Sequence, residues 1–186
     1  MELSFQIIRS DRKTLGLQIT PQGQVIAHAP RRMSTDEIRR FVESKGPWIQ
    51  KNLQKISSRP QLPKLTPEQM ELLARRALEV LPARVAHYAP QVGVTYGKIT
   101  IRNQRTRWGS CSSTGNLNFN VLLMLAPLEV LDYVVVHELC HRLEMNHSSR
   151  FWAEVARVLP NYRTSLQWLK ENGAALIESG TTPRNP

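Results

Sequence analysis

The chain of 186 residues contains only two cysteines, Cys111 and Cys140. Two thiols cannot form the disulfide framework of a small secreted protein, and in a reducing cytosol both should stay reduced. Long hydrophobic runs are also missing, because the longest, residues 121–128, is far below the ~20 residues that a membrane-spanning helix needs. Residues 1–24 alternate strand-like and charged segments, unlike a signal peptide. We therefore expect a cytoplasmic protein without a membrane segment.

Acidic residues are scarce relative to basic ones, and the formal net charge is +10. Residues 1–60 alone carry eleven basic and five acidic side chains, a net charge of +6. Such a surface can neutralise phosphates, so nucleic acid is one candidate partner. Basic surfaces also simply keep proteins soluble, and no nucleic-acid-reading motif accompanies this one. The residues that would form the basic patch are Arg9, Arg12, Lys13, Arg31, Arg32, Arg39 and Arg40.

The order of predicted elements indicates an α+β fold in two parts. We expect a strand-rich region with a helix over residues 1–60, a catalytic domain over 61–180 and a disordered polar tail over 181–186. The polar, proline-containing segment 57–63 resembles a linker. The predicted strands are residues 5–9, 15–19 and 24–29, with a turn at 21–23, and residues 98–103 and 116–121 in the second part.

Two capping boxes predict where helices begin. Ser34 stands three residues before Glu37, and the helix that follows should break at Gly46-Pro47. Thr66 stands three residues before Gln69, and we expect the second helix to end near Leu81.

The segment His137-Glu138-Leu139-Cys140-His141 is the most informative part of the chain. Positions i and i+4 of an α-helix lie one above the other, so His137 and His141 can reach one metal ion. Glu138 lies about 100° further round the helix, beside such an ion, where it can take a proton from water. Three imidazole ligands with an open fourth position are typical of catalytic zinc. The motif therefore predicts a zinc-dependent hydrolase with one zinc ion.

The flanking sequence supports a buried helix around this motif. Pro127 suits a helix start, and the acidic Glu129 suits the positive end of the helix dipole. Apolar residues then recur at helical spacing, at Leu128, Leu131, Val135 and Leu139.

His147 is the third candidate ligand, although it lies too far along the chain to share the face of His141 on one straight helix. A turn must intervene, and Asn146 is the residue that best accepts a left-handed conformation. Ser148 or Ser149 then caps a helix through residues 151–158. The alternatives are that His147 is a loop histidine, or that Glu144 or Glu154 is a ligand or orients one.

The stretch HELCHRLEMNHSSRFW resembles the metal-binding signature of the YgjP-like metallopeptidase family, which is related to SprT-like zinc proteases. Residues 107–112 and the segment 115–120 after them are similar to a second block of that family, and residues 9–17 to its N-terminal segment. The resemblance implies a zincin-like catalytic domain that cleaves protein or peptide substrates. In it, His137, His141 and His147 match the zinc ligands and Glu138 matches the general base. The spacing also equals that of metzincins, but Glu144 replaces their glycine, which argues against a metzincin.

The resemblance further implies that the strand near residues 117–120 lies by the zinc cleft, where an exposed edge could bind an extended peptide. Alternatively, the asparagines of this segment form the solvent face of an ordinary strand; they are Asn116, Asn118 and Asn120.

Two other functions fit the same residues. The site could hydrolyse the phosphoanhydride of a nucleoside triphosphate, aided by nearby arginines. It could also be a structural zinc site of a nucleic-acid-binding module, closed by Cys111, in which Glu138 would be dispensable. Residue type alone suggests three side chains that could stabilise an oxyanion, namely Arg105, Arg107 and Tyr162. The sequence does not define the physiological substrate or the oligomeric state.

Overall fold

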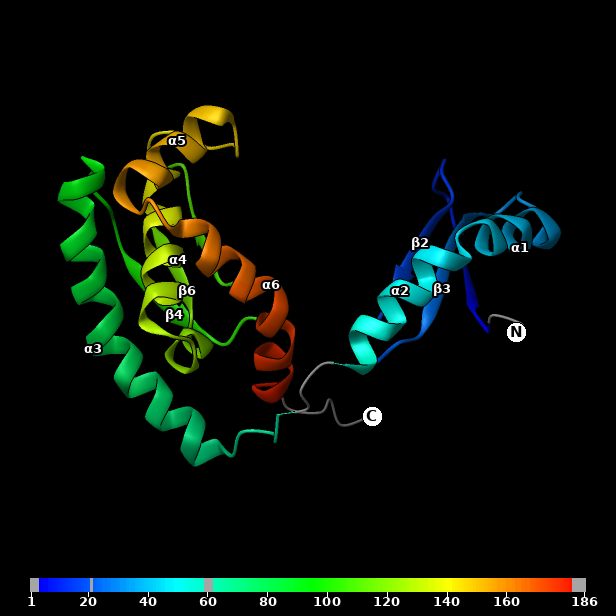
Figure 1. Cartoon of the computed structure of the whole chain (residues 1–186), viewed down its shortest axis with the longest axis horizontal. Coiled ribbons are helices and arrows are strands. Elements are labelled where there is room, and N and C mark those ends of the chain that lie inside the picture. The colour runs from blue at the N-terminus through cyan, green and yellow to red at the C-terminus, as the bar shows by residue number, and fades with distance from the viewer. Residues whose placement is uncertain (1–3, 21, 59–61, 182–186) are drawn as a thin grey trace. The chain divides into compact units, whose positions relative to one another are not determined.

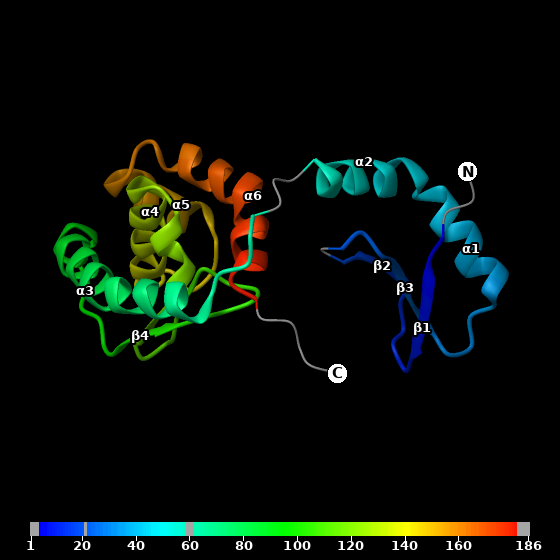
Figure 2. The same cartoon turned by 90° about the horizontal axis from the view of Figure 1, so that it is seen from below.

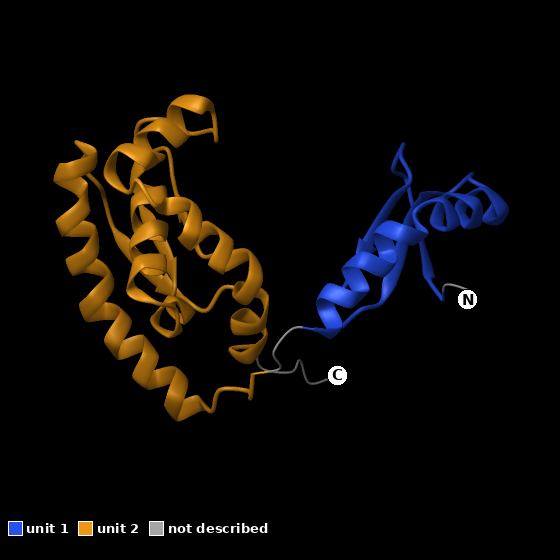
Figure 3. Ribbon diagram, in the orientation of Figure 1, with its two compact units in different colours: residues 1–60 blue, residues 61–186 orange. Residues whose placement is uncertain are grey.

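The computed structural model describes residues 4–20, 22–58 and 62–181. The chain divides into two compact units, residues 1–60 and 61–186 (Figure 3). Pro21 of the predicted turn, residues 59–61 of the predicted linker and residues 182–186 of the predicted tail lie outside the described residues. No helix in the described ranges is long and apolar enough to cross a membrane.

The first unit contains a three-stranded sheet in which the last strand along the chain lies in the centre (Figure 1). The central strand pairs in parallel with the first strand and antiparallel with the second. The three strands are β1 (Gln6–Ser10), β2 (Gly16–Ile19) and β3 (Val25–Pro30). The predicted strands are thus confirmed to within one residue at each end.

Two helices, α1 (Thr35–Ser44) and α2 (Gly46–Ser57), complete this unit. The capping box at the start of α1 is confirmed, since the Ser34 hydroxyl accepts from the Glu37 N–H and the Glu37 carboxylate accepts from the Ser34 N–H. The break before Pro47 is also confirmed. The core of the unit combines alternate residues of β3 with one face of each helix; it comprises Val25, Ala27, Ala29, Ile38, Val42 and Ile49.

The second unit begins with the long helix α3 (Pro67–Val92). Its predicted capping box is confirmed, but the predicted end near Leu81 is wrong, because α3 continues through Pro82 and Pro90. Each internal proline removes one backbone hydrogen bond and costs about 3 kcal/mol. Burial of an apolar stripe on both sides of Pro82 offsets this cost. The stripe comprises Ala77, Leu81, Val85, Ala89 and Val92.

The sheet of the second unit consists of β4 (Ile99–Arg102), β5 (Gly109–Cys111) and β6 (Leu117–Asn120), in the order β4-β6-β5. The two longer strands were predicted, whereas β5 was not. The central position of β6 contradicts the expectation that residues 117–120 form an exposed edge. Nor do the asparagines form a simple solvent face, because Asn120 is fully buried.

The remaining elements are η1 (Val121–Leu125), α4 (Leu128–Cys140), α5 (Ser149–Val158) and α6 (Tyr162–Ser179). Helix α4 packs against α3, α5, α6 and β5, and lies inside the unit (Figure 2). Residues 130–136 are all buried, which confirms the predicted buried helix. Leu128 is the exception to the predicted apolar stripe, because it is exposed in the first turn. The six α-helices and two sheets of the described residues confirm the α+β class.

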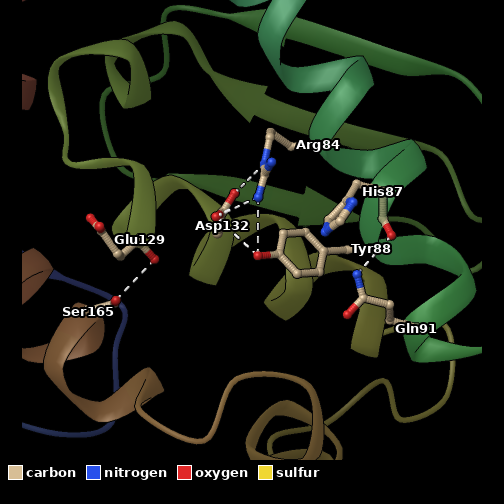
Figure 4. A network of polar contacts seen from close by, with 7 residues as sticks. All are labelled: Arg84, His87, Tyr88, Gln91, Glu129, Asp132 and Ser165. Atoms are coloured by element: carbon tan, nitrogen blue, oxygen red, sulfur yellow. Dashed lines mark hydrogen bonds and ion pairs between the residues drawn. The ribbon is translucent and has the colours of Figure 1, made fainter.

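A partly buried ion pair joins α4 to α3 (Figure 4). The Arg84 guanidinium donates to both carboxylate oxygens of Asp132, with N···O distances of 2.6 and 2.8 Å. The Tyr88 hydroxyl donates to Asp132 Oδ2 at 3.1 Å. On the other side, the Ser165 hydroxyl of α6 donates to the Glu129 carbonyl at 3.0 Å. These contacts fix α4 between its neighbours and satisfy a carboxylate that has little access to water.

Candidate metal centre

Three histidines converge at the C-terminal end of α4. His137 lies in the last turn, His141 is the residue directly after the helix, and His147 precedes α5. One nitrogen atom from each imidazole lies within 4.8 Å of the other two. His137 Nε2 and His147 Nε2 are 3.0 Å apart. The structure therefore brings the three predicted ligand residues together at a distance that one ion could span.

The connection between His141 and His147 turns without a left-handed residue. Among the described residues only glycines have a positive φ, so the left-handed conformation predicted for Asn146 is wrong. Its side-chain oxygen instead accepts from the Ser148 N–H at 3.2 Å. The Ser148 hydroxyl caps α5 by accepting from the Phe151 N–H at 3.3 Å, as predicted. An asparagine-centred turn and a serine cap thus replace the expected backbone conformation.

Neighbouring groups orient two of the imidazoles through their Nδ1 atoms. His141 Nδ1 lies 3.1 Å from the carbonyl oxygen of Glu144, and His137 Nδ1 lies 3.5 Å from the Tyr133 hydroxyl. The Phe151 ring packs against all three imidazoles, with centroid distances of 4.6 to 4.9 Å. Contacts of this kind hold ligand histidines in place and leave the Nε2 atoms available.

The two glutamates considered as alternative metal ligands form other contacts. Glu144 contributes its backbone carbonyl rather than its carboxylate to His141. The Glu154 carboxylate forms an ion pair with Arg157 at 2.8 Å. Neither carboxylate belongs to the group of side chains that could hold a metal ion among the described residues.

Burial favours the uncharged form of two of the imidazoles, those of His137 and His141. Burial, with smaller contributions from the nearby His141 and His147, lowers the pKa of His137 to about 3. Burial also lowers the pKa of His141. Neutral imidazoles have the free lone pair that a metal requires. Zinc–nitrogen bonds of about 2.0–2.1 Å in a tetrahedral site place ligand nitrogens roughly 3.3 Å apart, so this donor set fits zinc.

Glu138 lies on α4 next to His137 and is only 5% exposed. Burial raises the pKa of Glu138 to about 8, and the positive charge of Arg107 opposes that shift. The close approach of Gly109 in β5 encloses the carboxylate, because a Cβ atom at position 109 would lie 2.7 Å from Glu138 Cγ and Oε1. A glycine is therefore required at this point of β5 to make room for the buried carboxylate.

A cavity of about 380 Å³ opens beside His137 and Glu138. Of the three side chains considered for oxyanion stabilisation, Arg107 lines this cavity, whereas Arg105 and Tyr162 do not. Its other walls come from the segment before β5, from α4 and from α6; they comprise Thr106, Trp108, Gly109, Tyr133, Val134, Leu166, Leu169 and Lys170.

Asn120 shapes one wall of this cavity, a role that sequence reasoning missed. Its amide donates to the carbonyls of Gln104 and Arg107, at 2.8 and 2.9 Å. It thereby holds the loop that leads to Trp108 against the end of β6. No pattern in the sequence marks this role, because an asparagine that alternates with apolar residues normally faces solvent.

Cys111 does not join the histidines. Its sulfur contacts the Ser112 carbonyl at 3.4 Å, and the group that could hold a metal in the described part of the chain contains the three imidazoles alone. A site with three protein ligands keeps a position open for water or substrate, as catalytic zinc sites do. Cys140 is buried, as expected for a helix residue that faces the core.

Two residues of the predicted basic patch are engaged within the first unit. The Arg9 guanidinium donates to the carbonyl of Arg31 at 3.2 Å and to the Thr35 hydroxyl at 3.2 Å. The Arg31 guanidinium pairs with Asp11 at 2.7 Å. These arginines therefore stabilise the turn between β3 and α1, which weakens the argument that they are reserved for phosphates.

Comparison with known proteins gives one family match. Residues 13–71 and 64–172 match the family described as YgjP-like, metallopeptidase domain. No protein of curated function matches the chain. Among solved structures, the chain is similar to the metallopeptidase zymogens of Pyrococcus abyssi abylysin and Methanocaldococcus jannaschii jannalysin. The first has 23% identity, covers 50% of this chain and 98% of its own, and has a TM-score of 0.45. The second has 22% identity, covers 48% and 91%, and has a TM-score of 0.42.

The family match extends over both compact units and includes the histidines, Glu138 and the segment before β5. It agrees with the resemblance on which the sequence prediction was based. The chain belongs to the YgjP-like metallopeptidase family.

Proposed function

We propose that this protein is a zinc peptidase in which His137, His141 and His147 hold one zinc ion and Glu138 is the general base. The observation that carries the proposal is the convergence of three imidazoles beside a buried carboxylate. Membership of a metallopeptidase family supports peptide bonds as the substrate.

Zinc, when bound, lowers the pKa of water toward about 7 and polarises the substrate carbonyl. Glu138 takes a proton from the attacking water and delivers it to the leaving amine. Burial makes the Glu138 carboxylate a stronger base than an exposed glutamate would be. Gly109 and the walls of the cavity keep this carboxylate in one position.

The edge strand β5 is the element that would hold an extended substrate. Within the described residues β5 pairs with β6 alone, so its other edge has backbone groups without strand partners. Gly109 of β5 also lines the cavity beside Glu138. A peptide that adds a strand to this edge would pass the catalytic carboxylate.

Nucleoside triphosphate hydrolysis is the second candidate. The observation that favours it is the presence of Arg107 and Lys170 at the same cavity, since two cations there would also suit a polyphosphate.

The deciding experiment compares the zinc-loaded wild type with Glu138→Gln. Each is incubated with an unfolded protein and with nucleoside triphosphates, with and without single-stranded DNA. We expect the wild type to cleave the protein and Glu138→Gln to lose this activity by at least about a thousandfold while keeping its zinc. Nucleotide hydrolysis by the wild type without protein cleavage would replace the peptidase proposal with the second candidate.

The DNA arm tests whether the basic N-terminal unit recruits nucleic acid, which stays a prediction. If it does, DNA stimulates cleavage, and reversing the charges of Arg32 and Arg40 abolishes the stimulation. The effect should also fall steeply between 50 and 200 mM salt.

A further inference from the structure

The cavity beside Glu138 adjoins the candidate metal centre, because His137 and Glu138 form part of its lining. A substrate whose carbonyl reaches the histidines therefore places an adjacent group in this cavity. The volume of about 380 Å³ can hold one amino-acid side chain together with part of the peptide backbone.

The inner walls of the cavity are mainly apolar. Trp108 forms one wall and packs closely on α6, because a Cβ atom at Gly173 would lie 3.1 Å from its indole. Val134 of α4 and Leu166 and Leu169 of α6 also line the cavity. Methylene groups of a substrate would be desolvated favourably between these walls.

Two exposed cations, Arg107 and Lys170, line the same cavity and come from different segments of the chain. Arg107 stands in the loop before β5, and Lys170 stands on α6. Neither side chain forms an ion pair or a hydrogen bond with another described residue, whereas Arg84 and Arg157 are both paired with carboxylates. The only acidic side chain in the lining is Glu138.

We propose that Arg107 and Lys170 bind a substrate carboxylate and make the enzyme selective for peptides that carry one next to the bond to be cleaved. This inference rests on the proposed peptidase function and adds the substrate class. A glutamate side chain fits the lining well, because its methylenes contact the apolar walls while its carboxylate reaches the cations. The free carboxylate of a peptide C-terminus has the same chemistry and is the second source.

The test uses zinc-loaded full-length protein and two matched sets of fluorogenic peptides. One set carries a single glutamate, or glutamine in its place, at each position flanking the scissile bond. The other set ends in a free carboxylate or in an amide, with the scissile bond one residue from the end. The readout is the ratio of kcat/KM between the members of each pair.

We expect the wild type to prefer the carboxylate member of one set by about tenfold or more, since charge-assisted hydrogen bonds of this kind are strong. A preference in the first set identifies an acidic side chain, and one in the second identifies the C-terminus. The double variant Arg107→Gln with Lys170→Gln should reduce the preference to less than about twofold.

The matched control is Lys98→Gln with Arg102→Gln. Both residues are exposed and lie outside the cavity. Their substitution lowers the net charge by the same amount as the substitution of Arg107 and Lys170. This control should keep the preference of the wild type, which separates local binding from general charge effects.

Equal cleavage of both members of every pair by the wild type would overturn this inference and leave the peptidase function standing. A preference that survives in the Arg107→Gln, Lys170→Gln variant would also overturn it. If the zinc-loaded wild type cleaves no peptide of either set, the proposed function and the selectivity fail together.

Discussion

At the scale of single residues, the third histidine decides whether the three imidazoles form a metal site. Exposed His147 lies 3.0 Å from His137 through their Nε2 atoms, although it comes from a different segment of the chain. We expect His147→Ala to lower zinc affinity by more than about a hundredfold, as measured by competition with a chelator. His87→Ala, in the same unit but outside the group, should bind zinc like the wild type. Full zinc occupancy in His147→Ala under competition would exclude His147 as a ligand.

Gly109 limits the position of Glu138. In Gly109→Ala, the added methyl group would meet the glutamate side chain at 2.7 Å and displace it. A displacement of about 1 Å at a catalytic group can lower the rate about a hundredfold. We therefore predict such a loss in kcat for peptide hydrolysis, with zinc content unchanged, and an effect below about threefold for the neighbouring Ser110→Ala. Normal activity in Gly109→Ala would show that the Glu138 side chain can shift without loss of catalysis.

The buried acid and base also predict how the stability of the metal-free protein depends on pH. The folded pKa of Glu138 is about 8 against an ordinary value of 4.5, so the folded state retains this proton between those pH values and loses stability as pH rises through them. For His137 the folded pKa is about 3 against 6.5, so stability rises with pH up to 6.5. The two effects oppose each other below pH 6.5, and of the two only the Glu138 effect operates between pH 6.5 and 8.

Measured by urea unfolding with a chelator present, the free energy of unfolding should therefore fall from pH 6.5 to 8 by up to about 2 kcal/mol. Glu138→Gln cannot ionise and should show no such fall. An equal fall in both proteins would assign the pH dependence to other groups.

At the scale of elements, the position of α4 depends on its polar contact with α3. Arg84→Met would leave the buried Asp132 carboxylate without its cation (Figure 4). Because the Arg84 side chain is 26% exposed, we expect a loss of about 1–3 kcal/mol in the free energy of unfolding, below the range for fully buried pairs. The control is Arg75→Met, which removes the exposed pair with Glu71 on the same helix and should cost less than about 0.5 kcal/mol. Similar losses in both variants would show that the Arg84–Asp132 pair contributes no more to stability than an exposed ion pair.

The first residues of the helices and five of the six described strands followed from local chemistry, whereas helix lengths, the short strand β5 and strand order did not. The capping residues Ser34, Thr66 and Ser148 each form the predicted bond. By contrast, α3 continues past Pro82 because its second half packs on the core, a contact that no local pattern encodes. In the same way, the sequence predicts β6 as an ordinary strand, and only its pairing with β4 and β5 makes it the central strand of the sheet.

At the scale of the whole molecule, the two units have separate hydrophobic cores. All three histidines belong to the second unit, so zinc acts directly on that unit alone. At a free zinc concentration of 100 times the Kd, binding should add about 2.7 kcal/mol to its stability. Hydrogen exchange should therefore slow in α4 and its neighbours when zinc is added, with a smaller change in β1, β2 and β3. Equal slowing in both units would show that they unfold together.

The sequence by itself determined the α+β class, the family, and the four residues His137, Glu138, His141 and His147 as the candidate site. It could do so because helical periodicity, capping and motif spacing are properties of neighbouring residues. Only the tertiary structure decided which residues surround that site. Gly109, Asn120, Arg107 and Lys170 reach it from β5, β6, a loop and α6, and their roles arise from packing between segments that lie far apart along the chain. Side chains brought together in this way leave no local pattern, because the contacts that define them exist only after folding.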